Sequence, residues 1–458
     1  MIPVIVASAF LTGLAFLPPN ASAVLPPPDG GYPGGNTAEG QTALFSLTSG
    51  TYNTAVGVFS LRSNTEGNVN TANGAGALLL NTEDENTATG AGTLLSNTTG
   101  FGNTANGAFA LFSNTEGSGN TATGISALFS NTTGDDNTAN GTFALLNNTE
   151  GSSNTATGRD ALFANTTGGD NTATGRSALG NNTTGTQSTA NGVSALSSNT
   201  TGSFNTAGGF SALVGNTVGS TNTATGYRAL VANITGNGNT ANGVNALVNN
   251  TTGGFNIALG LQAGSNVVTA DNVICIGHDG QDVSNSCYIG QIFGATSSGG
   301  TQVFINADGK LGTATSSRRF KEEITPMDHA SEVLFALKPV TFRYKKGIDP
   351  QRIPQFGLVA EDVEAVNPDL VVREENGEIY TVRYDAVNAM LLNEFLKQHK
   401  AFLEEHRTVQ EQGATIADFK KEIASLTATV KEQAAQIQKV STRVELTKVA
   451  TQMVLDSP

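Results

Sequence analysis

The sequence predicts a β-solenoid built from 17-residue coils, followed by a small α/β domain and a C-terminal coiled coil. Three observations lead to this prediction: an unbroken internal repeat, a change of composition near residue 310, and a heptad pattern near the C-terminus. Residues 1–309 contain no lysine and four arginines against sixteen acidic residues, whereas residues 310–458 contain twenty basic and twenty-two acidic residues. Segments that differ so strongly in composition are separate folding units.

Residues 1–23 have the pattern of an export signal. A short apolar run at 5–16 is followed by Ala21-Ser22-Ala23, the small-residue pattern at which signal peptidases cut. The run is too short to span a bilayer. No basic residue precedes it, and the alternative is a buried N-terminal segment. Residues 24–35, rich in proline and glycine, are predicted to be a linker.

Residues 36–265 repeat with a period of seventeen residues, apart from one interval of sixteen. Each unit approximates N-T-A-x-G-x-x-A-L-x-x-N-T-x-G-x-x. A helical repeat needs about thirty residues and tolerates few glycines, so each unit is predicted to form one coil of a β-solenoid. The two glycines of the unit predict two corners, which leave two short extended segments.

The apolar positions of each unit are few and small. Stacking places each alanine and each Ala-Leu pair on its equivalent in the next coil, which predicts a thin core. So little apolar bulk is marginal for a lone chain. We therefore expect a homotrimer that buries the leucines and occasional phenylalanines such as Phe109 and Phe210. The repeat resembles the heads of trimeric autotransporter adhesins and the shafts of phage tail fibres.

The asparagine columns of the repeat allow two interpretations. Asn97, Asn131 and Asn165 each precede Thr-Thr, so they can be glycan acceptors, or such side chains can bind sugars. The favoured alternative is that stacked asparagines form hydrogen-bonded ladders. Acidic turns at 83–85 and 135–136 can similarly hold calcium, but they lack the alternating spacing of a calcium loop, so solvated charge is favoured.

Residues 266–315 are predicted to be an irregular β connector. They contain the two cysteines of the chain, Cys275 and Cys287. In an exported chain these can form a disulfide; alternatively, each is a small apolar core residue of a final, irregular coil. His278 lacks the neighbouring ligands that zinc requires, so neither a metal nor a cofactor is predicted.

The segment after residue 315 carries a series of family motifs. In order they are Ser316-Ser317-Arg318-Arg319-Phe320-Lys321-Glu322-Glu323-Ile324, Leu337-Lys338-Pro339-Val340-Thr341-Phe342-Arg343-Tyr344, Gly357-Leu358-Val359-Ala360-Glu361-Asp362-Val363, Pro368, Leu370-Val371 and Tyr384. Together they resemble the endosialidase-type intramolecular chaperone domain, which ends many phage tail spikes and fibres. We assign this domain to residues 316–400.

The resemblance implies a self-cleaving serine endopeptidase. In that family the domain trimerises, drives folding of the preceding fibre, and cuts itself off through a Ser–Lys dyad. Ser316 would be the nucleophile, Lys321 the general base and Arg319 a supporting residue, with cleavage between Thr315 and Ser316. Burial is needed for a lysine to deprotonate a serine. Ser317 stands where the family has aspartate, and it is also the alternative nucleophile.

The sequence predicts several elements within and after this domain. They are a helix at 332–337, a strand at 340–344, a strand or turn running into a helix at 357–366, a strand at 379–384 that closes the sheet, and then a long helix. Residues 401–450 are predicted to form a coiled coil. Its core positions are Ile416, Ile423, Val430, Ile437 and Val444, with Phe419, Leu426, Gln433, Val440 and Thr447.

These observations predict an exported, homotrimeric fibre or adhesin-like protein, extracellular or on the cell surface. The alternatives are a non-cleaving chaperone and trimerisation cap, or a prophage tail fibre in a virion. The acidic chain has no basic stripe, which disfavours nucleic acid, and the mature chain has no membrane span. Paired carboxylates do not recur, which disfavours a glycan-degrading enzyme. A cell-surface or glycan ligand remains open.

Overall fold

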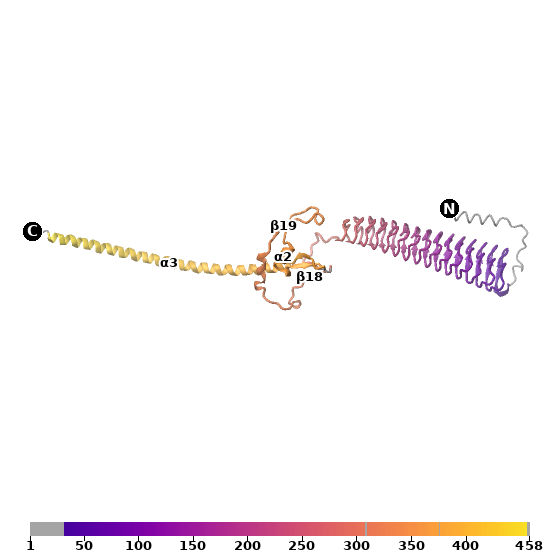
Figure 1. The fold of residues 1–458 in the computed structure, drawn as a ribbon, viewed down its shortest axis with the longest axis horizontal. Helices are drawn as coiled ribbons and strands as arrows, with labels where there is room; N and C mark the ends of the chain where they lie inside the picture. Colours follow the sequence, from indigo (N-terminus) through magenta and orange to yellow (C-terminus); the bar gives the residue numbers. More distant parts are fainter. Residues whose placement is uncertain (1–31, 307–308, 375, 456–458) are drawn as a thin grey trace. The chain divides into compact units, whose positions relative to one another are not determined.

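The computed structural model describes residues 32–306, 309–374 and 376–455, and the chain divides into two compact units, Met1–Thr296 and Ser297–Pro458. Figure 1 shows the stacked coils of the first unit and the long helix of the second. The predicted export signal at 1–23 and most of the predicted linker at 24–35 lie outside the described residues.

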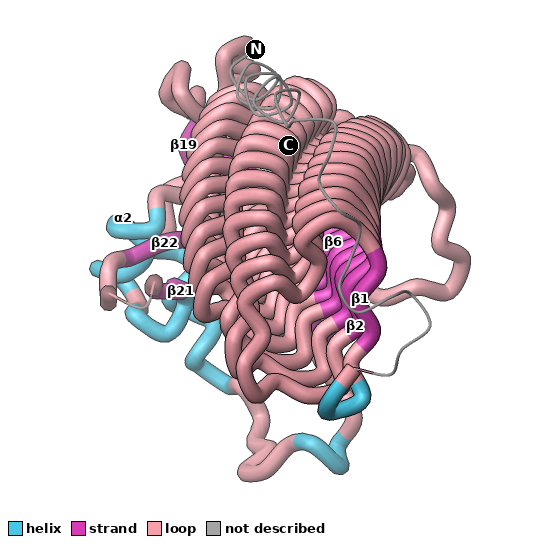
Figure 2. The backbone as a smooth tube through the Cα atoms, turned by 90° about the vertical axis from the view of Figure 1, so that its right-hand side faces the viewer, coloured by secondary structure: helices cyan, strands magenta, loops and turns pink. Residues whose placement is uncertain are grey.

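The first unit is a solenoid with one parallel sheet of sixteen strands that pair in chain order. Figure 2 shows these strands stacked in a single column. A short 3-10 helix, η1 (Pro33–Gly35), precedes them. The strands are β1 (Thr37–Glu39), β2 (Thr54–Val56), β3 (Thr71–Asn73), β4 (Thr87–Thr89), β5 (Thr104–Asn106), β6 (Thr121–Thr123), β7 (Thr138–Asn140), β8 (Thr155–Thr157), β9 (Thr172–Thr174), β10 (Thr189–Asn191), β11 (Thr206–Gly208), β12 (Thr223–Thr225), β13 (Thr240–Asn242), β14 (Ile257–Leu259), β15 (Val273–Ile276) and β16 (Ser286–Ile289). We call residues 36–289 the shaft.

Each regular coil holds one three-residue strand, so the predicted second extended segment is wrong. The Ala-Leu half of the coil turns instead, because every second residue has a left-handed backbone: φ is +61° at Phe109 and +51° at Leu111. Hydrogen bonds still run between coils there, as from Leu111 N to Ala127 O at 2.9 Å. The backbone is thus satisfied by stacking without strand geometry.

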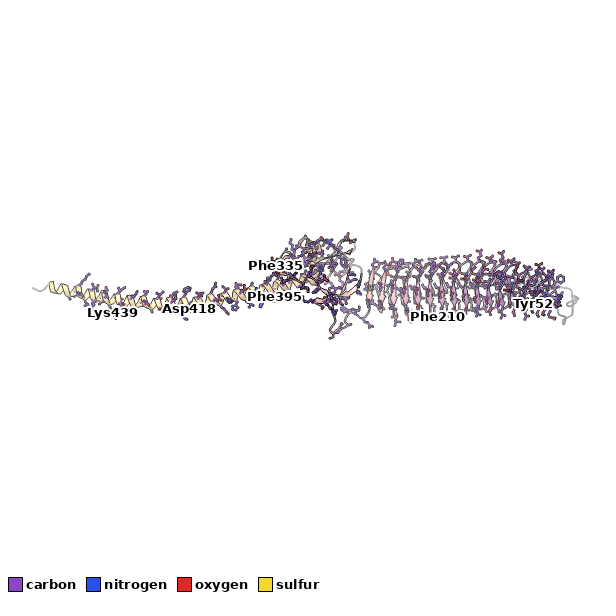
Figure 3. All side chains as sticks on the ribbon, turned by 90° about the horizontal axis from the view of Figure 1, so that it is seen from below. Tyr52, Phe210, Phe335, Phe395, Asp418 and Lys439 are labelled. Atoms are coloured by element: carbon purple, nitrogen blue, oxygen red, sulfur yellow. The ribbon has the colours of Figure 1, made fainter. Side chains whose placement is uncertain are left out.

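The core of the shaft belongs to the single chain. The alanine of each strand and the Ala-Leu pair are essentially inaccessible to solvent, as Ala122, Ala127 and Leu128 illustrate at 0% exposure. The expectation that the leucines are left for a partner chain is therefore wrong. Phe210 does remain 50% exposed, and Figure 3 shows it on the outside of the coils.

The two glycines of the repeat have different roles. Gly107 has a φ of +136°, and a Cβ placed there would lie 2.5 Å from the carbonyl oxygen of Gly124 in the next coil. Gly117 lacks a left-handed backbone, yet a Cβ there would lie 2.4 Å from the carbonyl oxygen of Gly134. Both glycines permit close stacking of the coils, and only the first also supplies a left-handed corner.

The stack extends beyond the repeat predicted at 36–265. Strands β15 and β16 continue the same parallel sheet, so residues 266–289 of the predicted connector belong to the shaft. The second unit contains an antiparallel pair, β17 (Val303–Ile305) with β18 (Leu311–Thr313).

The second unit contains short elements and one long helix. In order they are η2 (Arg318–Phe320), η3 (Asp328–Ala336), β19 (Val340–Phe342), β20 (Gln355–Gly357), α2 (Ala360–Val366), η4 (Pro368–Leu370), β21 (Val371–Arg373), β22 (Ile379–Val382) and α3 (Tyr384–Leu455), where η denotes a 3-10 helix. The strands expected near 340 and 379 are found. They do not share one sheet, because β19 pairs with β20 and β22 pairs with β21.

A small core joins α2, the β21–β22 pair and the start of α3. Its buried side chains are Val363, Leu370, Val371, Val382 and Val387. The Tyr384 hydroxyl, at the first residue of α3, accepts a hydrogen bond of 3.1 Å from the Leu358 amide. From residue 401 to 450 every residue of α3 is exposed. The long helix is thus confirmed, and its side chains from 401 onward have no cover within the described chain.

Candidate functional site

The predicted cleavage site lies in exposed backbone between β18 and η2. Thr315 and Ser316 follow the end of β18, and Ser317 is the N-cap of η2 with an extended backbone, φ −65° and ψ 140°. Lys321 caps the other end, where its amide donates to Arg318 O at 3.1 Å. A single turn of 3-10 helix therefore separates the predicted nucleophile from the predicted base.

The side chains of this site are open to solvent. Ser316, Ser317, Arg319 and Lys321 are all exposed. The Arg319 guanidinium lies 4.5 Å from the centre of the Phe320 ring, a cation–π contact. Among the described residues, no hydrogen bond joins Ser316 to Lys321. The structure thus places the predicted residues on one turn without assembling a dyad.

This arrangement limits what one chain can do chemically. A serine hydroxyl becomes a nucleophile when a base takes its proton, and a lysine serves as that base in a desolvated site. No described residue of the same chain covers Lys321, which is exposed. Any desolvation of this site must therefore come from another chain or from a rearrangement.

A buried polar cluster, absent from our sequence predictions, joins η3 to α3. Ser331 is fully buried, and its hydroxyl donates to Glu394 Oε1 at 2.5 Å. Asn393 Nδ2 donates to Ser331 Oγ at 2.6 Å, and Lys397 Nζ lies 2.7 Å from Glu394 Oε1. Ser331 lies more than sixty residues before Asn393 and Glu394 in sequence, so no local motif indicated the cluster.

Hydrogen bonds and ion pairs set the ionisation of the carboxylates and the lysine around Ser331. The hydrogen bonds from Lys397 and Ser331 hold the pKa of the Glu394 carboxyl below its usual value. His329, 2.5 Å from Glu332 Oε1, lowers the pKa of that second carboxyl. The pKa of Lys397 is raised, chiefly by its hydrogen bond to Glu394. The Ser331 hydroxyl donates to Glu394, and Lys397 Nζ donates to Ser331 Oγ at 3.4 Å, so in this arrangement the lysine does not take the serine proton. The cluster thus joins η3 to α3 and is not arranged as a second Ser–Lys dyad.

The asparagine columns form the ladders that the sequence favoured. Asn131 Nδ2 donates to Asn114 Oδ1 at 2.7 Å and to Gly134 O at 2.9 Å. In the other column, Asn137 N donates to Asn120 Oδ1 at 2.9 Å. Asn97, Asn131 and Asn165, the glycan-acceptor candidates, are fully buried. In the folded shaft these side chains are therefore inaccessible to a glycan or to a sugar ligand.

The two cysteines are free thiols in the structure. Cys275 occupies the core position of β15 in register with Ala258, as the second of the two alternatives expects. Burial raises the pKa of its thiol. Cys287 is exposed on β16, where it pairs with Ile274, so the expectation that it too is a core residue is wrong. Neighbouring strands thus direct the two side chains to opposite faces of the sheet.

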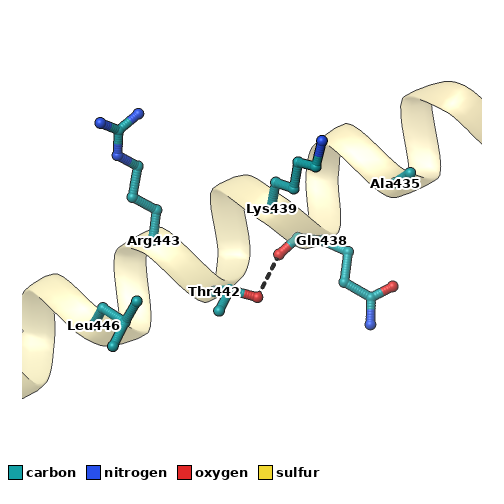
Figure 4. A pocket seen from close by; sticks show the side chains of 6 residues that line it. All are labelled: Ala435, Gln438, Lys439, Thr442, Arg443 and Leu446. Atoms are coloured by element: carbon teal, nitrogen blue, oxygen red, sulfur yellow. Dashed lines mark hydrogen bonds between the residues drawn. The ribbon is translucent and has the colours of Figure 1, made fainter.

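The described residues offer few other candidate sites. Residues 32–306, 309–374 and 376–455 contain no cluster of three or more acidic, histidine or cysteine side chains suited to a metal ion. Within the same ranges, no helix has the length and hydrophobicity of a membrane span. Two shallow hollows are lined by α3 alone, and Figure 4 shows one of them, between Ala435 and Leu446. A hollow formed by one exposed helix does not enclose a substrate.

One family model matches part of this chain. Residues 316–372 match the family described as chaperone of endosialidase, and the matched segment begins at Ser316. It runs from two residues before η2 to β21. No curated protein and no solved structure matches the chain. Residues 316–372 thus carry a chaperone-of-endosialidase segment, preceded in the chain by a β-solenoid.

Proposed function

We propose that this protein is an exported, trimeric fibre or adhesin-like surface protein that matures by cutting itself. In this proposal residues 316–458 direct assembly of the trimer and are then released by cleavage between Thr315 and Ser316. The observation that carries it is the start of the family match at Ser316, behind a solenoid that fits a fibre. The apolar run at 5–16 supports export.

The exposed stripe on α3 supports the trimer. Ile416, Ile423 and Val430 are between 54% and 61% exposed, at intervals of seven residues. The same spacing continues upstream to Phe402 and Phe395, which are also more than half exposed. A stripe of this kind is stable in water when other helices cover it. Three copies of α3 would bury it in a parallel coiled coil.

Assembly also supplies what the cleavage site lacks. Lys321 is exposed in the single chain, and a Ser–Lys mechanism requires a desolvated lysine. Neighbouring chains of the trimer would provide that cover. Cleavage would then follow assembly, so that release of residues 316–458 reports a completed trimer.

Replacement of Ser316 tests the cleavage. Wild-type protein should yield a C-terminal fragment whose N-terminal residue is Ser316, and Ser316→Ala and Lys321→Ala should remain intact. Ser317→Ala is the matched control and should still cut. Fragment masses and N-terminal sequencing give the readout. Loss of cleavage in Ser317→Ala but not in Ser316→Ala would identify Ser317 as the nucleophile.

The non-cleaving cap is the second candidate, because Ser317 replaces the aspartate that the resembled family carries. It predicts an intact wild-type chain that is still trimeric. Ile423→Asp should dissociate that trimer by light scattering, whereas Ala428→Asp, on the opposite side of the helix, should not. A monomeric wild-type chain would contradict both candidates.

A further inference from the structure

The outer face of the shaft changes character over its last three strands. Throughout β1–β13 the first residue of every strand is threonine, and the third is polar or glycine except for Val56. In β14 these positions become Ile257 and Leu259, and in β15 the equivalent residues are Ile274 and Ile276. The threonine column thus becomes an isoleucine column at one end of the shaft.

These side chains form two aligned columns. Ile257, Ile274 and Cys287 are in register in one of them, and Leu259, Ile276 and Ile289 are in register in the other. Their exposure is substantial, between 37% and 49% for the five aliphatic residues. We call these six residues the outer-face patch.

The outer-face patch does not serve the core of its own chain. The inward positions of the same strands are taken by Ala258 and Cys275, at 1% and 0% exposure. Replacing threonine by isoleucine on a water-facing strand adds exposed apolar area without adding to the core. Apolar side chains gathered in this way mark a contact surface.

A second copy of the chain is the occupant that fits best. The patch is apolar and uncharged, so the same surface on another copy complements it. Six side chains cover less than the roughly 800 Å² per partner that a stable complex buries. Such a patch needs tethering, and the proposed α3 coiled coil would hold the copies at high local concentration. It also lies on the coils next in sequence to the unit that carries α3.

We propose that the outer-face patch joins the shafts of neighbouring copies and keeps them together after residues 316–458 are released. The proposal rests on the proposed trimer. The α3 stripe leaves with the released fragment, whereas the patch, at residues 257–289, lies before the cut and stays. Assembly would thus begin at α3 and be retained at β14–β16.

Cross-linking through Cys287 tests the contact in the full chain. In the uncleaved Ser316→Ala protein, a short bifunctional maleimide should give covalent pairs that disappear in Cys287→Ser. Cys275→Ser is the control and should leave the pairs, because that thiol is buried. Ile276→Glu should abolish the pairs, and Thr225→Glu, in the same column three coils earlier, should not.

The mass of each variant separates this proposal from the proposed function. A Ser316→Ala chain that is trimeric by light scattering but gives no Cys287-dependent pairs overturns the patch alone. A monomeric Ser316→Ala chain overturns the trimer and the patch together. If the trimer and the patch contact are both observed, the fragment that ends at Thr315, released from the chain with Ser316 intact, should remain trimeric after cleavage. Ile276→Glu should convert this fragment to a monomer.

Discussion

At the residue scale, the buried asparagines replace the large side chains that the shaft lacks. Asn131 makes two donor bonds, and its Oδ1 also accepts from Asn148 Nδ2 at 2.8 Å. Each amide therefore satisfies backbone and neighbouring side chains where water is excluded. The coils are held by polar ladders as well as by alanine and leucine.

Asn131→Ala should destabilise the shaft by about 1–3 kcal/mol, because it leaves buried partners unsatisfied in two adjacent coils. Asn140→Ala is the matched control, since Asn140 is exposed at the outward end of β7. Urea unfolding monitored by circular dichroism measures both. An equal loss of stability in the two variants would show that the asparagine ladder does not stabilise the shaft.

Glu394 should make the attachment of α3 sensitive to acid. Its pKa is lowered in the folded chain, so its contribution is present above the unfolded value, about 4.3, and is lost as the pH falls through the folded value. Glu394→Gln should weaken this dependence, and Glu422→Gln, on exposed helix, should not. Thermal unfolding of the second unit from pH 7 downward is the measurement. A wild-type melting point that does not fall with pH would contradict it.

At the element scale, the coil of residues 70–85 is irregular, and the irregularity leaves one buried hydrogen bond unmade. It has sixteen residues, and Asn64 Oδ1 is buried without a hydrogen-bond partner in the described chain. Elsewhere the next coil supplies that donor, as Asn97 Nδ2 does for Asn81 Oδ1 at 2.7 Å. Asn81 Nδ2 instead donates to Glu83 O. The missing residue falls between Thr82 and Glu83.

Inserting one threonine between Thr82 and Glu83, together with Glu83→Gly to supply the glycine that close stacking needs at this position, should restore the ladder and stabilise the shaft by about 1 kcal/mol. The same insertion between Thr132 and Thr133, in a regular coil, should destabilise it. Thermal melting of the two variants decides the matter. If both insertions lower the melting temperature, the sixteen-residue coil is already well accommodated.

Periodic features of the sequence predicted the elements better than non-periodic ones. The alanine and asparagine columns were predictable because one residue type recurs at one position. The turn at Phe109 and Leu111 was not predictable, because a left-handed backbone at these residue types has no sequence signal. The Ser331 cluster was missed because its partners are distant in sequence. Ser316 and Lys321 were located by resemblance, yet one chain does not complete their site.

At the scale of the whole molecule, the two units have separate cores. The shaft core runs from Ala38 to Cys275, and the second core contains Val363 to Val387. Leu145→Ala should lower the stability of the shaft by about 2–5 kcal/mol. The unfolding temperature of the second unit should be unchanged in this variant. Val363→Ala should instead lower the unfolding temperature of the second unit and leave that of the shaft unchanged. Calorimetry resolves the two transitions, and a single shared transition would contradict their independence.

The in-register stacking of identical coils has a consequence for how such a protein varies over time. Each coil contacts the two coils beside it, and strands are spaced about 4.8 Å apart. Duplication or loss of one repeat in the gene would therefore change the length of the shaft by one fixed increment and leave its two ends unchanged. Unequal recombination between repeats can therefore lengthen or shorten the shaft by one coil at a time.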